Sequence, residues 1–523
     1  MVFPFYIKPE FVFIGTYIYE NDIYYLLPDC YVALGTIFCT MYGVYYSTEK
    51  EYGYPSLHQI FPMLGSFLCL GGLFLLWTTP FQNGILCNHT LLYDGLSIFF
   101  KTFLLGGAAF FFIICQKNFA TLPLNNFEYI LLLLCSITSM LFLISGFDFL
   151  TIYLTIELQA LCFYVCAASK KHSEFSTEAG LKYFLLGAFS SGLLLFGMAW
   201  IYGFTGMIHF SDLFLFATFP IEKDQSIPIL VGFLFLFFGF LFKLTAAPFH
   251  IWAPDVYEGT PTGITAFFAT FPKIGLLPPF WKILFLVLKI EEGTMYTQTM
   301  EPLLLFCVFL SIGIGTFAAL AQRKIKRILA YSSIAHIGYI LLGFACASSG
   351  GFQSVLIYYP IYMAATLGIF SILLTPQWNR RINGQEEGFG GKYLTDFAGI
   401  GKRTPLLGFI FSMFFFSLAG IPPLAGFYSK AFLFFTAIFS GLFYIALFSI
   451  LTSVCSCFYY IRFIRIFYFE KEIEGVSLQF FGIPKGTSYV IPICFFFIAC
   501  QPIWWHAFFK WTSFIALTLY LET

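Results

Sequence analysis

The chain has 523 residues, of which 59% are hydrophobic, 22% aromatic and only 10% charged. This composition excludes a soluble globular domain and is typical of a polytopic membrane protein. The 27 basic and 27 acidic residues cancel, so the net charge points to no class of partner, and no nucleic acid is expected among them.

The hydrophobic segments predict an all-α fold with about fourteen transmembrane helices, since one helical span needs about 20 apolar residues. Loops after odd-numbered spans hold seventeen Lys and Arg residues, whereas loops after even-numbered spans hold only Lys223 and Lys289. This bias places the odd loops in the cytoplasm or mitochondrial matrix and both termini on the other side. The predicted spans are 26–46, 57–78, 94–115, 127–146, 148–168, 177–202, 226–257, 261–290, 302–321, 325–347, 352–375, 404–436, 440–468 and 488–508.

Two of the predicted spans, the seventh and the twelfth, are interrupted. In the seventh, Lys243 is followed five residues later by Pro248, which removes a backbone donor. In the twelfth, the sequence LAGIPPLAGFYSK breaks the helix before Lys430. The two interruptions lie five helices apart, and an odd repeat length inverts the topology, so we expect two inverted five-helix repeats. The expected segments are 1–126 with helices 1–3, 127–290 with helices 4–8, 291–470 with helices 9–13, and 471–523 with helix 14.

Ionisable residues inside the spans are the candidates for function. A charge at the centre of a membrane helix costs about 2.5–3.5 kcal/mol. The spans contain one glutamate and four lysines of this kind, which together disfavour insertion by more than about 12 kcal/mol unless they are paired or hydrated. A chain selected only for packing would not carry so many. We therefore expect a proton pathway that includes Glu157, Lys182, Lys243, Lys273, His336 and Lys430.

Glu157 and Lys182 lie on consecutive predicted helices, which a hairpin can bring together. An acid and a lysine in a low dielectric form a switch, because separating them changes the proton affinity of each. Alternatively, Lys182 pairs with Glu178 one turn earlier and extends toward the interface. Lys243 has no acid near it in sequence, so its expected partner is Glu157, either in a proton pathway or in an ion pair that only holds the broken helix.

Lys273 follows Pro272, and a proline there frees a carbonyl in the preceding turn for water or a cation. His336, with Ser332 and Ser333 close by, is a candidate proton relay. A lone histidine on an apolar face is also compatible with a hydrogen-bonded packing residue.

Several other polar residues have less specific roles. His250, Asp255 and Glu258 follow the break in the seventh span and form either the mouth of the pathway or ordinary loop anchors. Lys101 and Lys282 are expected near an interface. The fourteen cysteines show no metal-ligand spacing, and there is no phosphate-binding or dinucleotide-binding glycine motif. The charged, Gly-rich loop 376–403 is expected to be a surface connection.

Several segments in this order resemble one known family. FKLTAAPFHIWAPDVYEGTPTGITAFFATFPKIG, LAYSSIAHIGYIL, ELQALCFYV, LKYFLLGAFSSGLLLFGMAWIYGFTG and DFAGIGKRTPLLGFIFSMFFFSLAGIPPLAGFYSKAFLF are similar to the subunit 2 family of respiratory complex I, the NADH:ubiquinone oxidoreductase, called subunit N in bacteria. The resemblance covers about residues 94–470. Pro278-Pro279, the aromatic stretch 1–25 and the long loop 376–403 depart from the family pattern.

The resemblance implies an antiporter-like subunit of the membrane arm of a proton-translocating NADH:ubiquinone reductase, mitochondrial in type. In it Glu157, Lys182, Lys243, Lys273 and Lys430 match the family's proton-channel residues. It implies no cofactor and no redox chemistry in this chain, with FMN, iron–sulfur clusters and ubiquinone held elsewhere in the complex.

The implied location is the mitochondrial inner membrane, with both termini toward the intermembrane space. The implied partners are neighbouring antiporter-like and other membrane-arm subunits, and lipids such as cardiolipin. Two alternatives stay open, a subunit of a sodium/proton antiporter complex of the same fold and a scaffold that no longer pumps. The intramembrane lysines argue against the scaffold, which would gain stability by losing them.

Overall fold

The computed structural model describes most of the chain. The aromatic stretch up to residue 17 and the start of the predicted C-terminal segment, 471–483, lie outside the described residues. The described ranges are 18–47, 57–79, 84–121, 127–170, 173–218, 223–293, 300–375, 378–382, 385–389, 392–470 and 484–522.

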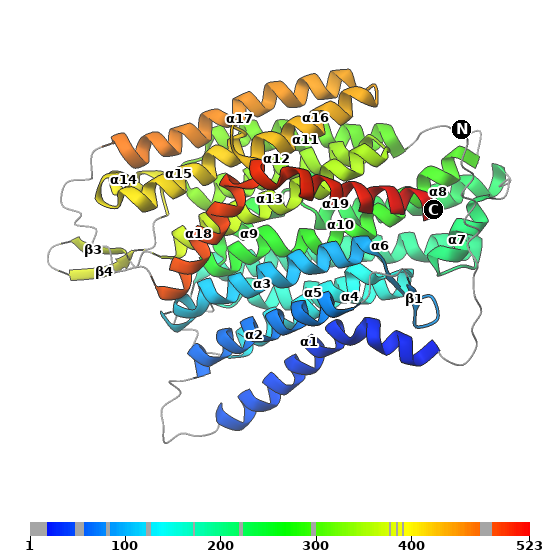
Figure 1. Ribbon diagram of the computed structural model, residues 1–523, viewed down its shortest axis with the longest axis horizontal. Helices are drawn as coiled ribbons and strands as arrows, with labels where there is room; N and C mark the ends of the chain where they lie inside the picture. The colour runs from blue at the N-terminus through cyan, green and yellow to red at the C-terminus, as the bar shows by residue number, and fades with distance from the viewer. Residues whose placement is uncertain are drawn as a thin grey trace.

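The described chain is a bundle of α-helices, most of them nearly parallel or antiparallel to the long axis of Figure 1. The helices are α1 (Ile18–Ser47), α2 (Leu57–Thr78), α3 (Gly95–Thr121), α4 (Glu128–Ser145), α5 (Phe149–Ala167), α6 (Glu174–Thr205), α7 (Phe210–Thr218), α8 (Lys223–Lys243), α9 (Trp252–Gly259), α10 (Thr262–Gly293), α11 (Met300–Ala321), α12 (Ile325–Ala345), α13 (Ser349–Leu374), α14 (Ile400–Arg403), α15 (Pro405–Ala419), α16 (Ala425–Phe439), α17 (Phe443–Phe469), α18 (Lys485–Ala499) and α19 (Gln501–Glu522). The short elements are β1 (Gly84–Leu86), β2 (Leu91–Tyr93), β3 (Trp378–Ile382), β4 (Gln385–Phe389) and the 3₁₀ helix η2 (Leu394–Phe397).

The predicted all-α membrane fold is confirmed. In the described ranges eleven helices are long and apolar enough to cross a membrane, or twelve if the bent pair α18 and α19 counts as one span. The predicted seventh span consists of the shorter pieces α8 and α9, and the twelfth of α15 and α16. The total of fourteen and the inverted repeats stay predictions, and the short helix α7 was not predicted.

Both helix breaks have identifiable backbone causes. α8 ends at Lys243, and Thr245 then takes a left-handed φ of 64°. Backbone groups that lose their helical hydrogen bonds at this end are paired with side chains. Trp252 Nε1 donates to the Phe242 carbonyl at 3.1 Å, and the Ala247 amide donates to Ser311 Oγ at 3.1 Å. α15 ends at a glycine with φ of 87°, which a side chain would disfavour. Irregular backbone inside a membrane is tolerated only where protein groups or water satisfy it in this way.

The bundle has two distinct ends, which Figure 1 shows at opposite sides of the picture. The hairpin end carries β3 and β4, antiparallel strands that pair Trp378 with Phe389, and the Ile325 amide at the start of α12 donates to the Lys392 carbonyl at 3.1 Å. The β1–β2 end carries β1 and β2, the α4–α5 turn and the start of α7, joined by the bridges Leu91–Gly146 and Asp148–His209. The loop predicted at 376–403 thus contains a hairpin, with 376–377, 383–384 and 390–391 outside the described residues.

The core of the bundle is formed by α10, α12 and α13. In their most apolar windows 83%, 94% and 94% of the residues are buried, against 33% in α1 and α17. A polar side chain on these central helices is therefore shielded from lipid by neighbouring helices, and a charge there can be solvated only by protein groups or trapped water.

Candidate functional site

The first break places Lys243 at the last residue of α8. Its ammonium lies 6.0 Å from the centre of the Tyr164 ring, and among the described residues it makes no ion pair. Tyr164 lies two turns after Glu157 on α5, so the ammonium lies against the helix that carries this carboxylate. One oxygen of Glu157, Oε1, is buried and has no hydrogen-bond partner in the described part of the chain. The expected partnership of Glu157 with Lys243 forms no ion pair among the described residues and stays a prediction.

The predicted ion pair between Glu157 and Lys182 is not formed. The Lys182 ammonium lies 2.7 Å from Glu178, one turn earlier on α6, and 3.0 Å from the Asp255 carboxylate on α9. The side chain is 43% exposed. The rotation of α6 directs Lys182 along its own helix and toward α9, so the alternative pairing with Glu178 is the one observed.

The second piece of the broken seventh span, α9, is held by ion pairs on two sides. Asp255 also binds Arg327 of α12 at 2.7 Å, and Arg327 lies 2.5 Å from Glu258. Lys324 forms a further ion pair with Glu258. Asp255 and Glu258 therefore anchor α9 between α6 and α12, while His250, half-buried in the break, takes no part in these pairs.

Lys273 lies in the centre of the bundle and is 1% exposed. Its ammonium is 3.4 Å from the Tyr362 hydroxyl and 5.3 Å from the centre of that ring, and no described carboxylate pairs with it. Pro272 deprives the Phe268 carbonyl of its helical donor, as expected. The Tyr257 hydroxyl donates to this carbonyl at 3.0 Å, in the position where the sequence predicts water or a cation.

His336 joins three tyrosines. Its Nδ1 lies 2.5 Å from the Tyr358 hydroxyl and its Nε2 lies 3.2 Å from the Tyr460 hydroxyl. The Tyr362 ring, which contacts Lys273, has its centre 4.9 Å from the imidazole. The histidine is thus hydrogen-bonded, as a packing residue would be. Its two hydrogen-bond partners are hydroxyl groups, which can exchange protons, and the neighbouring Tyr362 also contacts Lys273.

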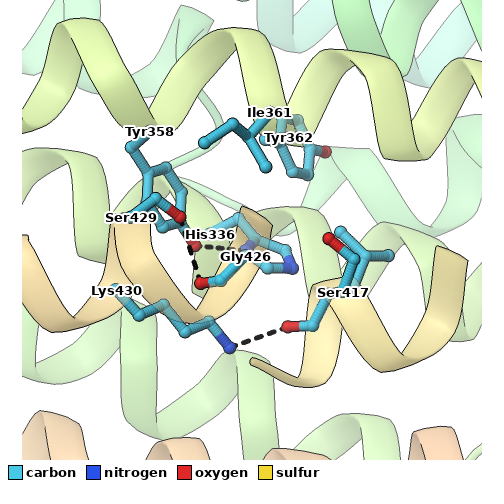
Figure 2. Close-up of a pocket in the computed structure, with 9 residues that line it drawn as sticks. His336, Tyr358, Ile361, Tyr362, Ser417, Gly426, Ser429 and Lys430 are labelled. Atoms are coloured by element: carbon cyan, nitrogen blue, oxygen red, sulfur yellow. Dashed lines mark hydrogen bonds between the residues drawn. The ribbon is translucent and has the colours of Figure 1, made fainter. Parts of the chain in front are cut away.

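Lys430 extends back over the second break. Its ammonium donates to the Leu418 carbonyl at 2.7 Å and the Ala419 carbonyl at 3.1 Å, the last carbonyls of α15. Figure 2 shows Tyr358 and Tyr362 on one side of His336 and Lys430 on the other, around one cavity. The cavity has room for about one water molecule. His336, Tyr362 and Lys430 line this cavity, and Tyr362 also binds Lys273, so the structure brings the three predicted residues Lys273, His336 and Lys430 around one tyrosine and one cavity.

A family model described as NADH:quinone oxidoreductase/Mrp antiporter, transmembrane, matches residues 146–456. The chain belongs to this family. All six predicted pathway residues, from Glu157 to Lys430, lie inside the segment that matches this oxidoreductase/antiporter model.

Curated members of the oxidoreductase/antiporter family are similar over nearly the whole chain. NADH-ubiquinone oxidoreductase chain 2 of Marchantia polymorpha is 45% identical over 484 residues, 92% of this chain and 95% of the relative. NADH-quinone oxidoreductase subunit N of Rhodospirillum rubrum is 36% identical, with 90% and 93% covered.

Solved structures of the family agree with the fold. A chain of respiratory complex I from Thermus thermophilus with bound aureothin matches 92% of this chain and 98% of that chain at 26% identity, with a TM-score of 0.74. A chain of the Mrp complex from Dietzia matches 96% and 98% at 16% identity with a TM-score of 0.76, a likeness of fold alone.

Sequence reasoning on this family member missed the tyrosines that link the charged groups. Tyr358, Tyr362 and Tyr460 lie among 32 tyrosines in the chain, and nothing in their local sequence separates a bridging hydroxyl from a packing ring. It also missed the role of Arg327 as a partner of Asp255. That signal was present, because Arg327 lies in the basic first turn of α12, but the partner is 72 residues away.

Proposed function

We propose that this chain is an antiporter-like core subunit of the membrane arm of a proton-translocating NADH:ubiquinone oxidoreductase, and that it conducts protons across the membrane. The observation that carries the proposal is the buried series Lys273, Tyr362, His336 and Lys430 in the centre of the bundle. Such groups are costly at mid-membrane depth and are a default sign of a proton or ion path. FMN, iron–sulfur clusters and ubiquinone belong to other parts of such a complex, so this chain moves protons only.

We propose a distinct task for each central group. Lys273 holds a proton without a carboxylate to retain it, and the Tyr362 hydroxyl at 3.4 Å passes the proton toward His336. The imidazole has two nitrogens with different partners, so it takes a proton on one and gives one up on the other. A water molecule in the shared cavity completes the contact to Lys430.

The first half of the molecule supplies access. We infer two inverted repeats, 127–290 and 291–470, which place Lys243 and Lys430 beside corresponding breaks. Lys243 and Glu157 then form the inner part of an entry path, and Lys182 with Asp255 forms its mouth at the hairpin end. Because Asp255 binds Lys182 and Arg327 together, a displacement of α9 changes the position of Lys182.

The orientation follows from the basic loops. We propose that the hairpin end, with Arg323, Lys324 and Lys392, faces the mitochondrial matrix and that both termini and the β1–β2 end face the intermembrane space. Other membrane-arm subunits cover part of the apolar exterior. Lipids of the inner membrane, cardiolipin among them, cover the rest and bind basic residues at the matrix surface.

The second candidate is a subunit of a sodium/proton antiporter complex, which the likeness of fold to the Mrp complex favours. Affinity purification of this chain from mild detergent, followed by mass spectrometry, separates the two. We expect flavoprotein and iron–sulfur subunits in the same particle, together with NADH:quinone activity. A particle without redox subunits, whose proton flux depends on sodium, would refute the proposed function.

A further inference from the structure

Four charged side chains lie buried near the β1–β2 end, away from the site described above. Asp29 on α1 and Lys101 on α3 are each 1% exposed, Asp94 at the start of α3 is 3% exposed, and Lys282 on α10 is 6% exposed. The Lys101 ammonium lies 2.5 Å from the Asp29 carboxylate. Lys101 is six residues, about 9 Å, inside α3, so the pair is below the surface of the bundle.

Lys282 is held in the same way as Lys430. Its ammonium donates to the Ile144 carbonyl at 3.3 Å and the Gly146 carbonyl at 3.2 Å, at the end of α4. Lys430 likewise binds the last carbonyls of α15. In both places the negative end of a helix dipole, in place of a carboxylate, stabilises the cation. Lys282 therefore has the same kind of partner as Lys430, the free carbonyls at the end of a helix.

Two carboxylate oxygens in this cluster have no partner. Asp94 Oδ1 accepts from the Ser97 amide at 2.7 Å and caps α3, but Asp94 Oδ2 and Asp29 Oδ1 are buried without a hydrogen bond among the described residues. A buried unsatisfied polar atom costs about 1–3 kcal/mol, more if charged. A cluster that served only to hold helices together would gain stability by satisfying them. Their presence points to a mobile water or proton as the missing partner.

The cluster connects to the centre of the bundle along α10. Lys282 binds the Gly146 carbonyl, and Gly146 pairs with Leu91 of β2, three residues before Asp94. Gly275 faces Met140 of α4, and Lys282 lies two turns further along the same face of the helix. Pro279 has no N–H to donate to the Gly275 carbonyl, which lies two residues beyond Lys273.

We propose that Lys282, Asp94 and the Asp29–Lys101 pair form a proton-release site toward the intermembrane space. The site rests on the proposed function and adds an outlet to it. The transfer runs through one intervening water: an N–H bond of the Lys282 ammonium breaks as an O–H bond forms on the water, and the water gives one of its own protons to Asp94 Oδ2. The carboxyl group then releases the proton at the β1–β2 end, and the Asp29–Lys101 pair keeps the local charge balanced.

Two conservative substitutions separate this role from a structural one. Asp94→Asn keeps an oxygen that caps α3 but cannot take up a proton. Lys282→Arg keeps the charge and the donors for the α4 carbonyls but does not release a proton. The assembled oxidoreductase is reconstituted into vesicles, and NADH oxidation, proton uptake and the amount of complex are measured. Lys273→Met is the positive reference, and Lys510→Met, on an exposed residue of α19, is the matched control.

We expect both variants to assemble and to lose proton transport as far as Lys273→Met does, while Lys510→Met is unchanged. Full transport in both variants beside a defective Lys273→Met would overturn the release site and leave the proposed function standing. Full transport in Lys273→Met as well would overturn both. If neither conservative variant assembles, the cluster is structural and the proposal is wrong.

Discussion

Replacing Lys273 tests the centre of the proposed path. The side chain is 1% exposed, and among the described residues its polar contact is the Tyr362 hydroxyl. A charge at this depth costs about 2.5–3.5 kcal/mol, so Lys273→Met, which has a similar length and no charge, should leave assembly unchanged or improved. NADH:quinone turnover coupled to proton transport should nevertheless collapse, because the proton site is gone. Lys273→Arg should also be inactive, since arginine keeps its proton.

Tyr362 allows the magnitude to be worked out. Tyr362→Phe keeps the ring 5.3 Å from the ammonium but removes the hydroxyl 3.4 Å away. A hydrogen bond to a charged group contributes about 1.5–3 kcal/mol, and this one is long, so about 1.5 kcal/mol is expected, or roughly tenfold in coupled turnover.

Turnover and proton uptake are measured in membranes, with assembly followed on native gels. Full coupled activity in Lys273→Met, or an active Lys273→Arg beside an unassembled Lys273→Met, would show that the reasoning is wrong.

Three other predictions follow from the ion pairs, the topology and the close helix contact. A double-mutant cycle of Lys182→Met with Asp255→Asn should give a coupling of about 0.2–1 kcal/mol in the activation free energy of turnover, as for a partly exposed pair, and strict additivity would contradict the observed contact. Protease added outside intact mitoplasts should not cut at Arg323, and cleavage there would invert the proposed orientation. Gly426→Ala should lower the thermal stability of the complex by about 1–3 kcal/mol, because a Cβ there would clash with the Ser417 carbonyl, and an unchanged melting temperature would argue against the tight packing of α16 on α15.

The sequence was sufficient for features that depend on composition and backbone chemistry. The breaks beside Lys243 and before Lys430 were predicted from proline and glycine, and the helices end there. These signals are local, because a proline lacks its donor in any fold.

Pairings that depend on helix rotation were not predictable. Glu157 and Lys182 lie at similar distances from the turn between α5 and α6, yet α6 turns Lys182 toward Asp255 of α9, 73 residues away. The sequence fixes depth along a helix but not which neighbour a side chain faces. The tyrosines around His336 were missed for the same reason, since they lie on helices other than the one that carries the histidine.

The contact of Lys430 with two carbonyls has a consequence for proton counting. A carboxylate partner would itself titrate, so that proton loss from the lysine could be cancelled by proton gain at the acid. Peptide carbonyls do not titrate in water near neutral pH, and the dipole of α15 is permanent. In the proposed path, each proton lost from Lys430 would therefore change the local charge by one full unit, with no compensating change at its carbonyl partners, and the imidazole of His336 lines the same cavity.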